Sequence, residues 1–412
     1  MIFHRVSDDW VTAITGPLRA DVCRTLRSLD LARLQKYPPP KLVGLKFGNE
    51  TRVLRRFLQG RSSTLDASAL SSWYRTFASA RDRLLYRAFR QNDALTRDEW
   101  TTILAEGADA WQRHHLLAAD GDRWRCRFSV VAIDGVLYVV DPLNDHGGPH
   151  QTVALNLASN GGDPDLQQFN HVYIGQDSLR MIEFMAPESY PADGRYLDCG
   201  NGAGALLLYF GRRFAETVGI DINRRSVAVA SFNAELNGLP GVHCHLDNAL
   251  TLGSKYGRFD LVTWNLPFNF IPVEYKDIAI DGYGGDLGIE LCMQFIDTLP
   301  PLLKPAGVAH VAAVSPMLEN GAFPLEDQLR DVLPRLRLDC VLQVLQWTWA
   351  DVRSVWEFHR QHRIKRFESA DLALRPGTGK LTRVEAPVGR QLVDVVREKM
   401  YHRHFGARTA TS

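Results

Sequence analysis

The chain has 412 residues, of which 45% are hydrophobic and 23% charged, a composition that excludes disordered, collagen-like and coiled-coil proteins and predicts two or three globular domains. The 48 basic and 47 acidic residues nearly cancel, which excludes an overall charge bias toward nucleic acid or membranes. The charges are unevenly placed, because residues 1–100 hold 18 Lys and Arg against 10 Asp and Glu (net +8) and residues 331–412 hold 15 against 9 (net +6).

The first part of the chain, from Thr12 to about Ala118, is predicted to be helical. Leu18, Val22, Leu26 and Leu29 recur near a helical period. Strand-like alternation then begins near Trp124 and runs to Asp134-Gly135, a dipeptide typical of hairpin turns, before an apolar β-branched run from Val136 to Val140. Helices followed by a two-stranded wing predict a winged-helix-like domain, which serves either as a docking element for nucleic acid or a partner, or as a lid.

Residues 143–170 are rich in Gly, Asn, Asp and Pro and are predicted to be a linker or mobile loop. We therefore expect a winged-helix-like domain over 1–142 and a second domain over 171–412. In the second domain short apolar strands alternate with helical stretches, the rhythm of a doubly wound α/β sheet. The predicted strands are Tyr196–Cys199, Thr217–Ile222, Val242–Leu246, Leu261–Trp264, Val308–Val314 and Cys340–Leu345.

A glycine-rich turn follows the first of these strands. The segment Asp198-Cys199-Gly200-Asn201-Gly202-Ala203-Gly204 leads into a helical run. Glycine permits tight turning and lets a ligand lie against bare backbone, and a helix N-terminus offers unpaired N–H groups. The turn predicts a nucleotide-like ligand, although glycine-rich loops also occur without one.

Acidic and amide side chains end the next two strands. Asp221, followed by Ile222, stands 21 residues after Gly200 (221 − 200), close to the spacing of about 20 for a ribose-binding acid. Asp247 and Asn248 end the third strand, where they would either bind an adenine edge or cap a helix. The fourth strand ends in Asn265-Leu266-Pro267-Phe268. Four strand ends therefore meet at one edge, where open α/β sheets bind ligands.

The order and spacing of these motifs resemble class I S-adenosylmethionine-dependent methyltransferases with an Asn-Pro-Pro-Tyr/Phe signature. Asn265 to Phe268, Asp281 to Gly288 and Leu303 to Gly307 are similar to the branch of release-factor glutamine and ribosomal-RNA guanine N-methyltransferases, and Tyr173 to Ser178 occupies the position of a short motif that closes over the cofactor. The resemblance covers about Val172 to Leu345 and implies a Rossmann-like, seven-stranded sheet with S-adenosyl-L-methionine as cofactor.

The resemblance also assigns site residues. The cofactor-binding residues are expected to be Tyr173, Asp198, Gly200, Asn201, Gly202, Gly204, Asp221, Ile222, Asp247, Asn248 and Asn265. The catalytic residues are expected to be Asn265, Leu266, Pro267 and Phe268. In such enzymes the asparagine side chain and the carbonyl after it accept hydrogen bonds from a planar amino group on which the aromatic ring stacks.

Two positions depart from the family pattern. Asn201 stands between the glycines of the first loop, and Leu266 replaces the first proline of the signature. Leu266 still supplies a carbonyl but not the rigidity of proline. We therefore expect N-methylation of a small molecule or peptide, with methylation of an RNA base or a protein glutamine, docked by the basic N-terminal domain, as the alternative.

Other functions have weaker support in the sequence. His243 and His245, His359 and His362, and His402 and His404 form pairs without a zinc-ligand set, so no metal is expected. Cys199 is expected to pack under the loop rather than act as a nucleophile, and Trp264 to fill the core rather than touch adenine. A catalytically silent adaptor is disfavoured by the intact glycines, Asp221 and Asn265.

Cysteine usage and hydropathy predict the compartment. The six cysteines are scattered with no Cys-x-x-Cys pair, which indicates a reducing cytoplasm. No apolar run approaches the roughly 20 residues that cross a bilayer, so no membrane span is expected.

Overall fold

The computed structural model of the protein describes residues 10–32, 79–90, 92–142, 172–186, 188–270, 272–273, 276, 282–349, 359 and 361–385. The predicted linker 143–170 lies outside the described residues, as do Asp281, His402 and His404. The chain divides into two compact units, one with residues 1–175, 202–212 and 223–244 and the other with residues 176–201, 213–222 and 245–412. The domain boundaries expected from the sequence stay a prediction.

The described residues of the first unit up to Arg113 are mainly helical, as predicted. Its elements are α1 (Trp10–Ala13), α2 (Gly16–Ser28), α5 (Ala80–Phe89), α6 (Arg97–Leu104), α7 (Gly107–Arg113), β1 (Leu117–Asp120), β2 (Arg123–Cys126), β3 (Ser129–Ile133) and β4 (Val136–Val140). Val22 and Leu26 on α2 are fully buried, and Phe89, Trp111 and Phe128 form an aromatic cluster in the core.

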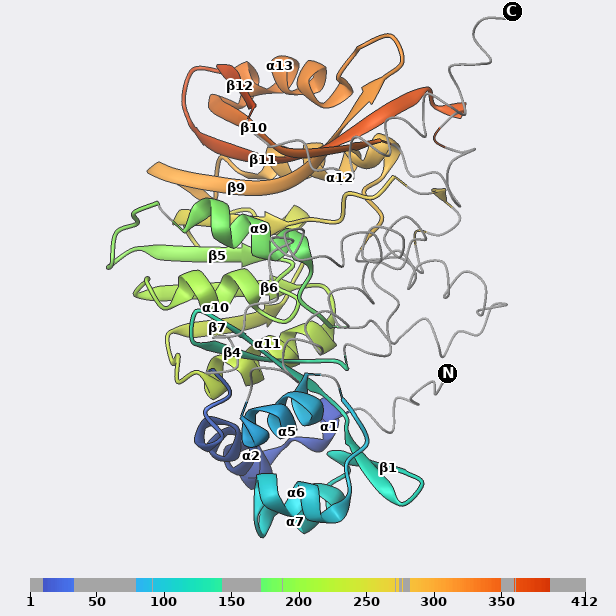
Figure 1. The fold of residues 1–412 in the computed structure, drawn as a ribbon. Coiled ribbons are helices and arrows are strands. Elements are labelled where there is room, and N and C mark those ends of the chain that lie inside the picture. The colour runs from blue at the N-terminus through green and yellow to red at the C-terminus, as the bar shows by residue number, and fades with distance from the viewer. Residues whose placement is uncertain are drawn as a thin grey trace, which may run out of the picture. The chain divides into compact units, whose positions relative to one another are not determined.

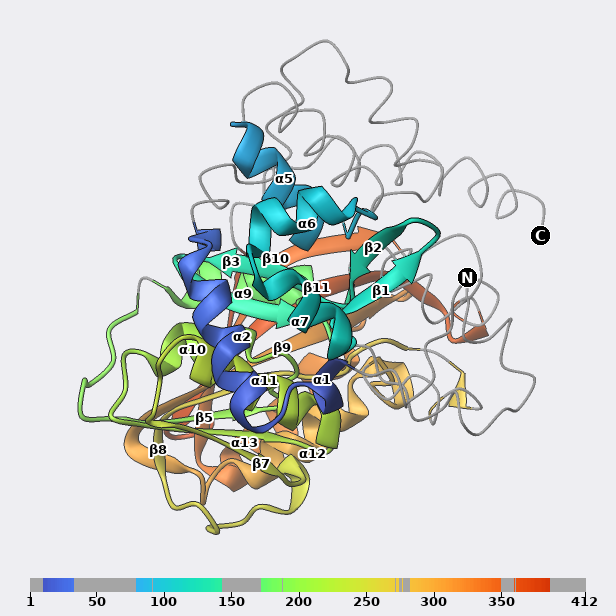
Figure 2. The same cartoon turned by 90° about the horizontal axis from the view of Figure 1, so that it is seen from below.

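The predicted hairpin at Asp134-Gly135 is confirmed by the antiparallel pairing of β3 with β4. Both turn residues have positive φ (46° and 81°), as a tight two-residue turn requires. The continuous alternation expected from Trp124 to Asp134 is wrong, because β2 ends at Cys126 and pairs with β1 in a separate hairpin before β3 begins (Figure 2). The chain breaks at Phe128, whose fully buried ring belongs to the aromatic cluster. The winged-helix assignment stays a prediction.

Two helices from later in the chain complete the first unit, α10 (Ala205–Gly211) and α11 (Arg224–Leu236). Asn233 of α11 accepts from the Val139 N–H at 2.8 Å and donates to the Val139 carbonyl at 3.0 Å. Asn237, one turn on, makes the same pair of bonds to Leu137. The two amide side chains thus satisfy backbone groups of β4 as a neighbouring strand would.

An eight-stranded sheet in the order β12-β10-β11-β9-β8-β5-β6-β7 (Figure 1) holds all of its strands except the first residues of β7 in the second unit. Its strands are β5 (Arg195–Cys199), β6 (Glu216–Asp221), β7 (Val242–Leu246), β8 (Phe259–Asn265), β9 (Leu303–Leu318), β10 (Leu338–Trp349), β11 (Ile364–Pro376) and β12 (Leu381–Glu385). β5 pairs in parallel with β6 and β8, and β8 in parallel with β9, whereas β11 runs antiparallel to both of its neighbours. The six strands predicted after residue 171 are confirmed.

The expected count of seven strands is wrong, because the described residues form eight. The strands predicted from the sequence did not include β11 or β12. β11 lies inside the sheet but contains Glu368 and Asp371, both fully buried, and β12 is a five-residue edge strand. Charged partners compensate the two acids: Arg383 contacts Glu368 at 2.8 Å and His310 contacts Asp371 at 2.8 Å.

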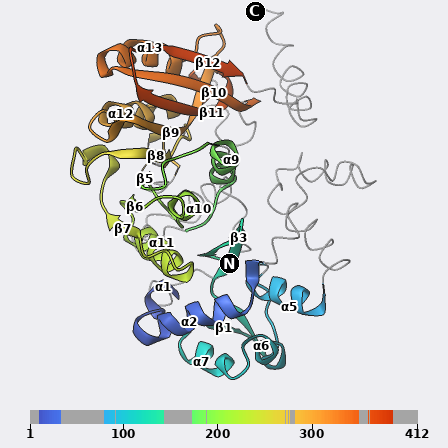
Figure 3. The ribbon, with the colours of Figure 1, turned by 90° about the vertical axis from the view of Figure 1, so that its left-hand side faces the viewer.

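Helices cover both faces of this sheet within the second unit. α12 (Glu290–Thr298) and α13 (Pro324–Leu336) pack on an apolar face that includes Val311, Ala313 and Leu372. α9 (Gln176–Met185) lies on the opposite side of β8 and β9 (Figure 3). Two single-turn 3-10 helices are η5 (Ala249–Thr251), which follows β7, and η7 (Asp286–Gly288), which precedes α12. Among the described residues no helix combines the length and apolarity that crossing a membrane needs.

Candidate active site

The first position of the glycine turn after β5 requires glycine for a steric reason. Gly200 has φ of +60°, and a Cβ placed there would lie 2.6 Å from Nε1 of Trp264. The Trp264 ring is held edge-on against Phe295 at a centroid distance of 4.5 Å. Any larger residue at position 200 must therefore displace a packed core ring, and the turn exposes bare backbone.

The rest of the turn is fixed by backbone geometry. The Asn201 N–H donates to the Ile220 carbonyl at 3.0 Å, which ties the turn to β6. Gly202 and Gly204 also have positive φ (50° and 86°), and Gly204 is the N-cap of α10. A Cβ on Gly202 would meet nothing within 4 Å, so this glycine is required only by its backbone conformation.

Asp198 is tied to the neighbouring strand. Its carboxylate accepts a hydrogen bond of 2.6 Å from Thr263 Oγ1, which lies 2.7 Å from the Tyr196 hydroxyl, and all three residues are buried. Burial is the main reason that the pKa of Tyr196 is raised well above its usual value. The chain of polar groups joins β5 to β8 directly below the turn. The sequence had not singled out Thr263, which reads as an ordinary strand residue.

The ends of β6 and β7 are joined through their backbones. The Asp247 N–H donates to the Asp221 carbonyl at 3.0 Å. Asp221 is the half-buried last residue of β6, and Ile222 after it is 60% exposed. A carboxylate next to an exposed apolar side chain is a combination that can bind a sugar hydroxyl and an aromatic ring.

Asp247 and Asn248 have different environments. Asp247 accepts from Lys255 Nζ at 2.5 Å and from the Tyr256 hydroxyl at 2.9 Å, and the hydrogen bond from Lys255 is the main cause of its lowered pKa. Asn248 caps η5, because its Oδ1 accepts from the Leu250 N–H at 3.0 Å. The helix-cap interpretation is confirmed for Asn248, and an adenine contact by Asp247 stays a prediction.

Asn265 is the last residue of β8, and a hydrogen bond orients only the nitrogen end of its side-chain amide. Its Nδ2 donates to Ser178 Oγ on α9 at 2.9 Å. Its Oδ1 is buried and has no hydrogen-bond partner in the described part of the chain. A buried carbonyl oxygen without a donor costs free energy unless a ligand supplies one. The fixed orientation therefore leaves the acceptor atom available.

The Leu266–Phe268 segment contacts a second motif. Leu266 is 1% exposed and Phe268 is half-buried. A Cβ on Gly284 would lie 2.7 Å from Phe268 Cα, and one on Gly288 would lie 2.4 Å from the Phe268 carbonyl oxygen. The structure thus brings together two motifs that are separate in the sequence, and the glycines of the second are needed for this close approach.

Several further expectations can be placed. Cys199 is fully buried, and burial raises its pKa well above the usual value, so it is not a thiolate nucleophile. Trp264 belongs to the core, as predicted. His243 and His245 are both exposed, and no group of three or more His, Cys, Asp or Glu in the described segments is arranged to hold a metal ion. Tyr173 is half-buried in the first unit, and its contact with a cofactor stays a prediction.

A buried charged cluster near Asn265 was missed by the sequence analysis. His310 Nδ1 lies 2.8 Å from Asp371 Oδ2, and His310 Nε2 lies 3.3 Å from Glu188 Oε1. Burial opposes a charge on His310, but Asp371 and Glu188 outweigh it and raise its pKa to about 9. The available signal was the presence of His310 and Asp371 in otherwise apolar strands, since buried ionisable groups need a local explanation.

Comparisons with known proteins find similarity to methyltransferases. Residues 192–357 match a family described as a methyltransferase domain. A protein of Methanocaldococcus jannaschii named as a protein N5-glutamine methyltransferase is 32% identical over 122 residues, which are 28% of this chain and 59% of the relative. Ribosomal RNA small subunit methyltransferase C of Alcanivorax borkumensis is 24% identical over 145 residues, 35% of this chain and 40% of the relative. The chain thus spans between about two fifths and three fifths of these curated relatives.

Among solved structures, TYW2 of M. jannaschii in complex with AdoMet is 14% identical, with a TM-score of 0.37 over 61% of this chain and 87% of that one. The family match lies on the sheet and the strand ends described above. Residues 192–357 are therefore similar to a methyltransferase domain.

Proposed function

We propose that the whole protein is an S-adenosylmethionine-dependent methyltransferase that methylates a nitrogen atom of a small molecule or peptide. The observation that carries the proposal is the Asn265 side chain, whose Nδ2 is anchored by Ser178 while its buried Oδ1 has no donor among the described residues. An acceptor atom held in this way can orient the N–H of a substrate.

The residues at the strand ends suit the cofactor. Gly200 provides a backbone surface that a side chain would block. Asp221 would bind the ribose hydroxyls, Ile222 would contact the adenine face, and Asp247 would accept from the adenine amino group. Tyr173, Asp198, Asn201, Gly202, Gly204 and Asn248 complete the proposed cofactor-binding set.

The cofactor supplies an already activated methyl group, so the protein must chiefly orient the nucleophile. Asn265 Oδ1 and the Leu266 carbonyl would accept the N–H bonds of the attacking nitrogen, and Phe268 would stack on its plane. Pro267 would restrain the backbone between them. Two fixed acceptors align the nitrogen lone pair and stabilise the positive charge that develops during transfer.

The relatives favour a second candidate, methylation of a protein glutamine or an RNA base, because those are the activities in their names. The basic N-terminal part, proposed as a winged-helix-like docking domain over 1–142, would then bind the target. Its described arginines are partly neutralised, as in the ion pairs Arg87–Glu99, Arg97–Asp109 and Arg125–Asp120. This neutralisation favours the small-molecule or peptide substrate.

The proposal is tested with methyl-labelled S-adenosylmethionine and three separate acceptor pools: total RNA, glutamine-containing peptides and a low-molecular-weight metabolite extract. We expect label in the metabolite pool, whereas label on the glutamines of the peptides would favour the protein-glutamine candidate. Label confined to RNA would show that RNA, and not a small molecule or peptide, is the substrate. Absence of cofactor binding by calorimetry would overturn the proposed methyltransferase activity.

A further inference from the structure

A side chain of α11 holds the glycine turn. Asn233 is fully buried, and its Nδ2 donates a 2.9 Å hydrogen bond to the carbonyl of Ala203, which lies inside the turn. A trans peptide is planar, and its C=O and N–H groups point in opposite directions. The bond that fixes the Ala203 carbonyl therefore also fixes the N–H of Gly204, which points away from Asn233.

Asn233 also connects the turn to strand β4. Its Nδ2 donates to the Val139 carbonyl at 3.0 Å, and its Oδ1 accepts from the Val139 N–H at 2.8 Å. The bonds to Val139 and Ala203 use both amide hydrogens of the side chain, so β4 sets its orientation. The direction of the Ala203 carbonyl thus depends on the β3–β4 hairpin, which the sequence places in the N-terminal domain.

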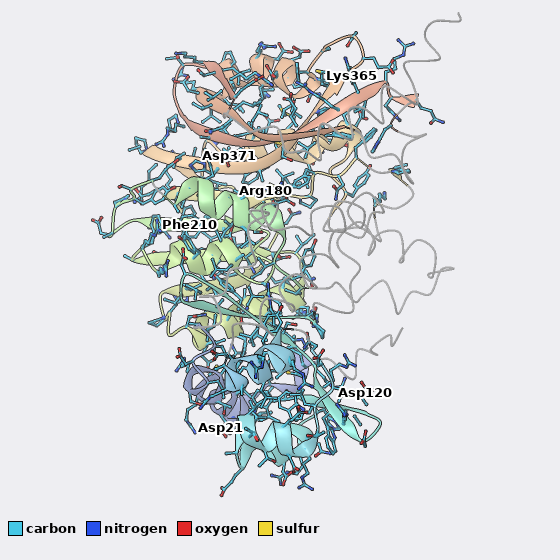
Figure 4. All side chains as sticks on the ribbon, in the orientation of Figure 1. Asp21, Asp120, Arg180, Phe210, Lys365 and Asp371 are labelled. Carbon is cyan, nitrogen blue, oxygen red and sulfur yellow. The ribbon has the colours of Figure 1, made fainter. Side chains whose placement is uncertain are left out.

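A second hydrogen bond joins the hairpin to the helix that follows the turn. The hydroxyl of Tyr138 on β4 is fully buried with its ring and donates at 3.1 Å to the carbonyl of Ala205, the first residue of α10. All seven residues of α10 are buried, including Phe210, which Figure 4 labels. A helix buried on all sides shifts only if its close-packed neighbours move. The hairpin therefore fixes the start of α10 as well as the turn.

The residue after β4 anchors the hairpin at its other end. Asp141 is 1% exposed, and its two carboxylate oxygens pair with the two terminal nitrogens of Arg225 on α11 at 2.5 Å. The same carboxylate accepts from Trp10 Nε1 at 2.8 Å and from the Val172 N–H at 2.7 Å. A bidentate pair with two further donors has a defined geometry. It fixes the hairpin to the start of α11, and it fixes Val172, the residue before Tyr173, to the hairpin.

We propose that Asn233 and Tyr138 are positioning residues for the cofactor, so the β3–β4 hairpin supports the cofactor site and is not a mobile wing. This inference rests on the proposed function, in which the glycine turn binds S-adenosylmethionine. The two side chains contact the backbone of the turn and of α10, and they act by holding it in the conformation that the cofactor binds. Loss of this support means that binding must order the turn, which lowers the affinity.

The chain contains a matched control for Asn233. Asn237 makes the same pair of bonds to the backbone of Leu137, but it also donates at 2.7 Å to the Asn233 carbonyl of its own helix instead of to the turn. Asn233→Ala and Asn237→Ala therefore each release one residue of β4, and only Asn233→Ala also releases the turn. Calorimetry on the full chain measures the dissociation constant of S-adenosylhomocysteine. We expect binding to be about tenfold weaker in Asn233→Ala and within about twofold of the wild type in Asn237→Ala.

The choice of temperature separates positioning from stability. Circular dichroism identifies a temperature at which each variant is fully folded, and there a lower stability by itself leaves the dissociation constant unchanged. A change in affinity at that temperature therefore reports a change in the site.

A milder pair of variants serves if Asn233→Ala does not fold. Tyr138→Phe keeps the ring and removes the hydroxyl that bonds the Ala205 carbonyl. Its control is Tyr209→Phe, which removes a hydroxyl that donates at 2.8 Å to Asp134 at the turn of the hairpin. We expect S-adenosylhomocysteine to bind about threefold more weakly to Tyr138→Phe and with wild-type affinity to Tyr209→Phe.

The outcomes are distinct. Unchanged affinity in a folded Asn233→Ala variant, or an equal loss in Asn237→Ala, overturns the inference and leaves the proposed function intact. If Asn233→Ala does not fold, unchanged affinity in Tyr138→Phe has the same meaning. A wild-type protein that does not bind S-adenosylhomocysteine overturns both the inference and the proposed function.

Discussion

Asn265 Nδ2 donates a 2.9 Å hydrogen bond to Ser178 Oγ, so the end of β8 is oriented by the helix that covers it. This bond fixes which atom of the amide is free to act: the nitrogen is occupied and the oxygen is left for a ligand. The orientation of the Asn265 amide thus depends on a residue 87 positions earlier in the chain.

Asn265→Ala should abolish most turnover and leave cofactor binding nearly unchanged. Loss of one oriented acceptor costs about 3 kcal/mol in the transition state, or about a hundredfold in kcat, whereas the adenosine is held elsewhere. Kinetics and calorimetry with S-adenosylhomocysteine measure the two effects. Ser178→Ala should give a smaller loss of kcat in the same direction, because the acceptor remains but its orientation is freed. Undiminished turnover in Asn265→Ala would show that the assignment of this signature is wrong.

Asp221→Ala should weaken the binding of S-adenosylmethionine by about 2 to 3 kcal/mol, because it removes charge-assisted hydrogen bonds to the ribose. Calorimetry measures the change directly. Asp122→Ala, which removes an equivalent charge from the exposed β1–β2 turn, is the matched control and should bind normally. Equal affinities of the two variants for S-adenosylmethionine would show that Asp221 does not bind the cofactor.

Gly200→Ala and Gly202→Ala form a matched pair. Both force an L-residue into positive φ, which costs about 1 to 2 kcal/mol, but only the first also drives a Cβ to within 2.6 Å of Trp264. Thermal unfolding should therefore show a larger drop in Tm for Gly200→Ala, with weaker cofactor binding because Trp264 and the turn must move. The same Tm for both variants would mean that the Trp264 ring can move aside without loss of stability.

His310 makes stability depend on pH. Its pKa is raised from 6.5 to about 9 in the folded protein by Asp371 and Glu188, so its contribution is full below pH 6.5 and is lost as the pH rises through 9. The shift corresponds to a contribution on the order of 3 kcal/mol. Denaturant unfolding between pH 6 and 10 should show this decline in the wild-type protein and a flatter dependence in His310→Gln. Parallel curves for the two proteins would contradict it.

RNA binding should be weak and unselective. Nearby acids partly neutralise the arginines of α5, α6 and β2 and so reduce the positive charge that phosphates would meet. A gel-shift series across salt concentrations should show affinity falling with a slope of about −0.7 for each neutralised phosphate of a single strand. Tight, structure-selective binding at physiological salt would favour the RNA alternative instead.

The sequence by itself determined the central strands and the residues at their ends. β5 to β8 are short apolar runs whose carboxyl ends carry Gly200, Asp221, Asp247 and Asn265, and local patterning of this kind is visible without any long-range contact. The hairpin at Asp134-Gly135 was equally local, because its turn needs residues that tolerate positive φ.

Only the tertiary structure decided the rest. β11 does not look like an interior strand in the sequence, because it contains the charged residues Glu368 and Asp371. In the fold these two acids are stabilised by Arg383 and His310 from other parts of the chain. Asn265 and Asp371 lie in one row of the sheet only because β8, β9 and β11 are paired in register. Buried ionic partners and strand register depend on contacts between distant residues, and a linear pattern of hydrophobicity does not contain them.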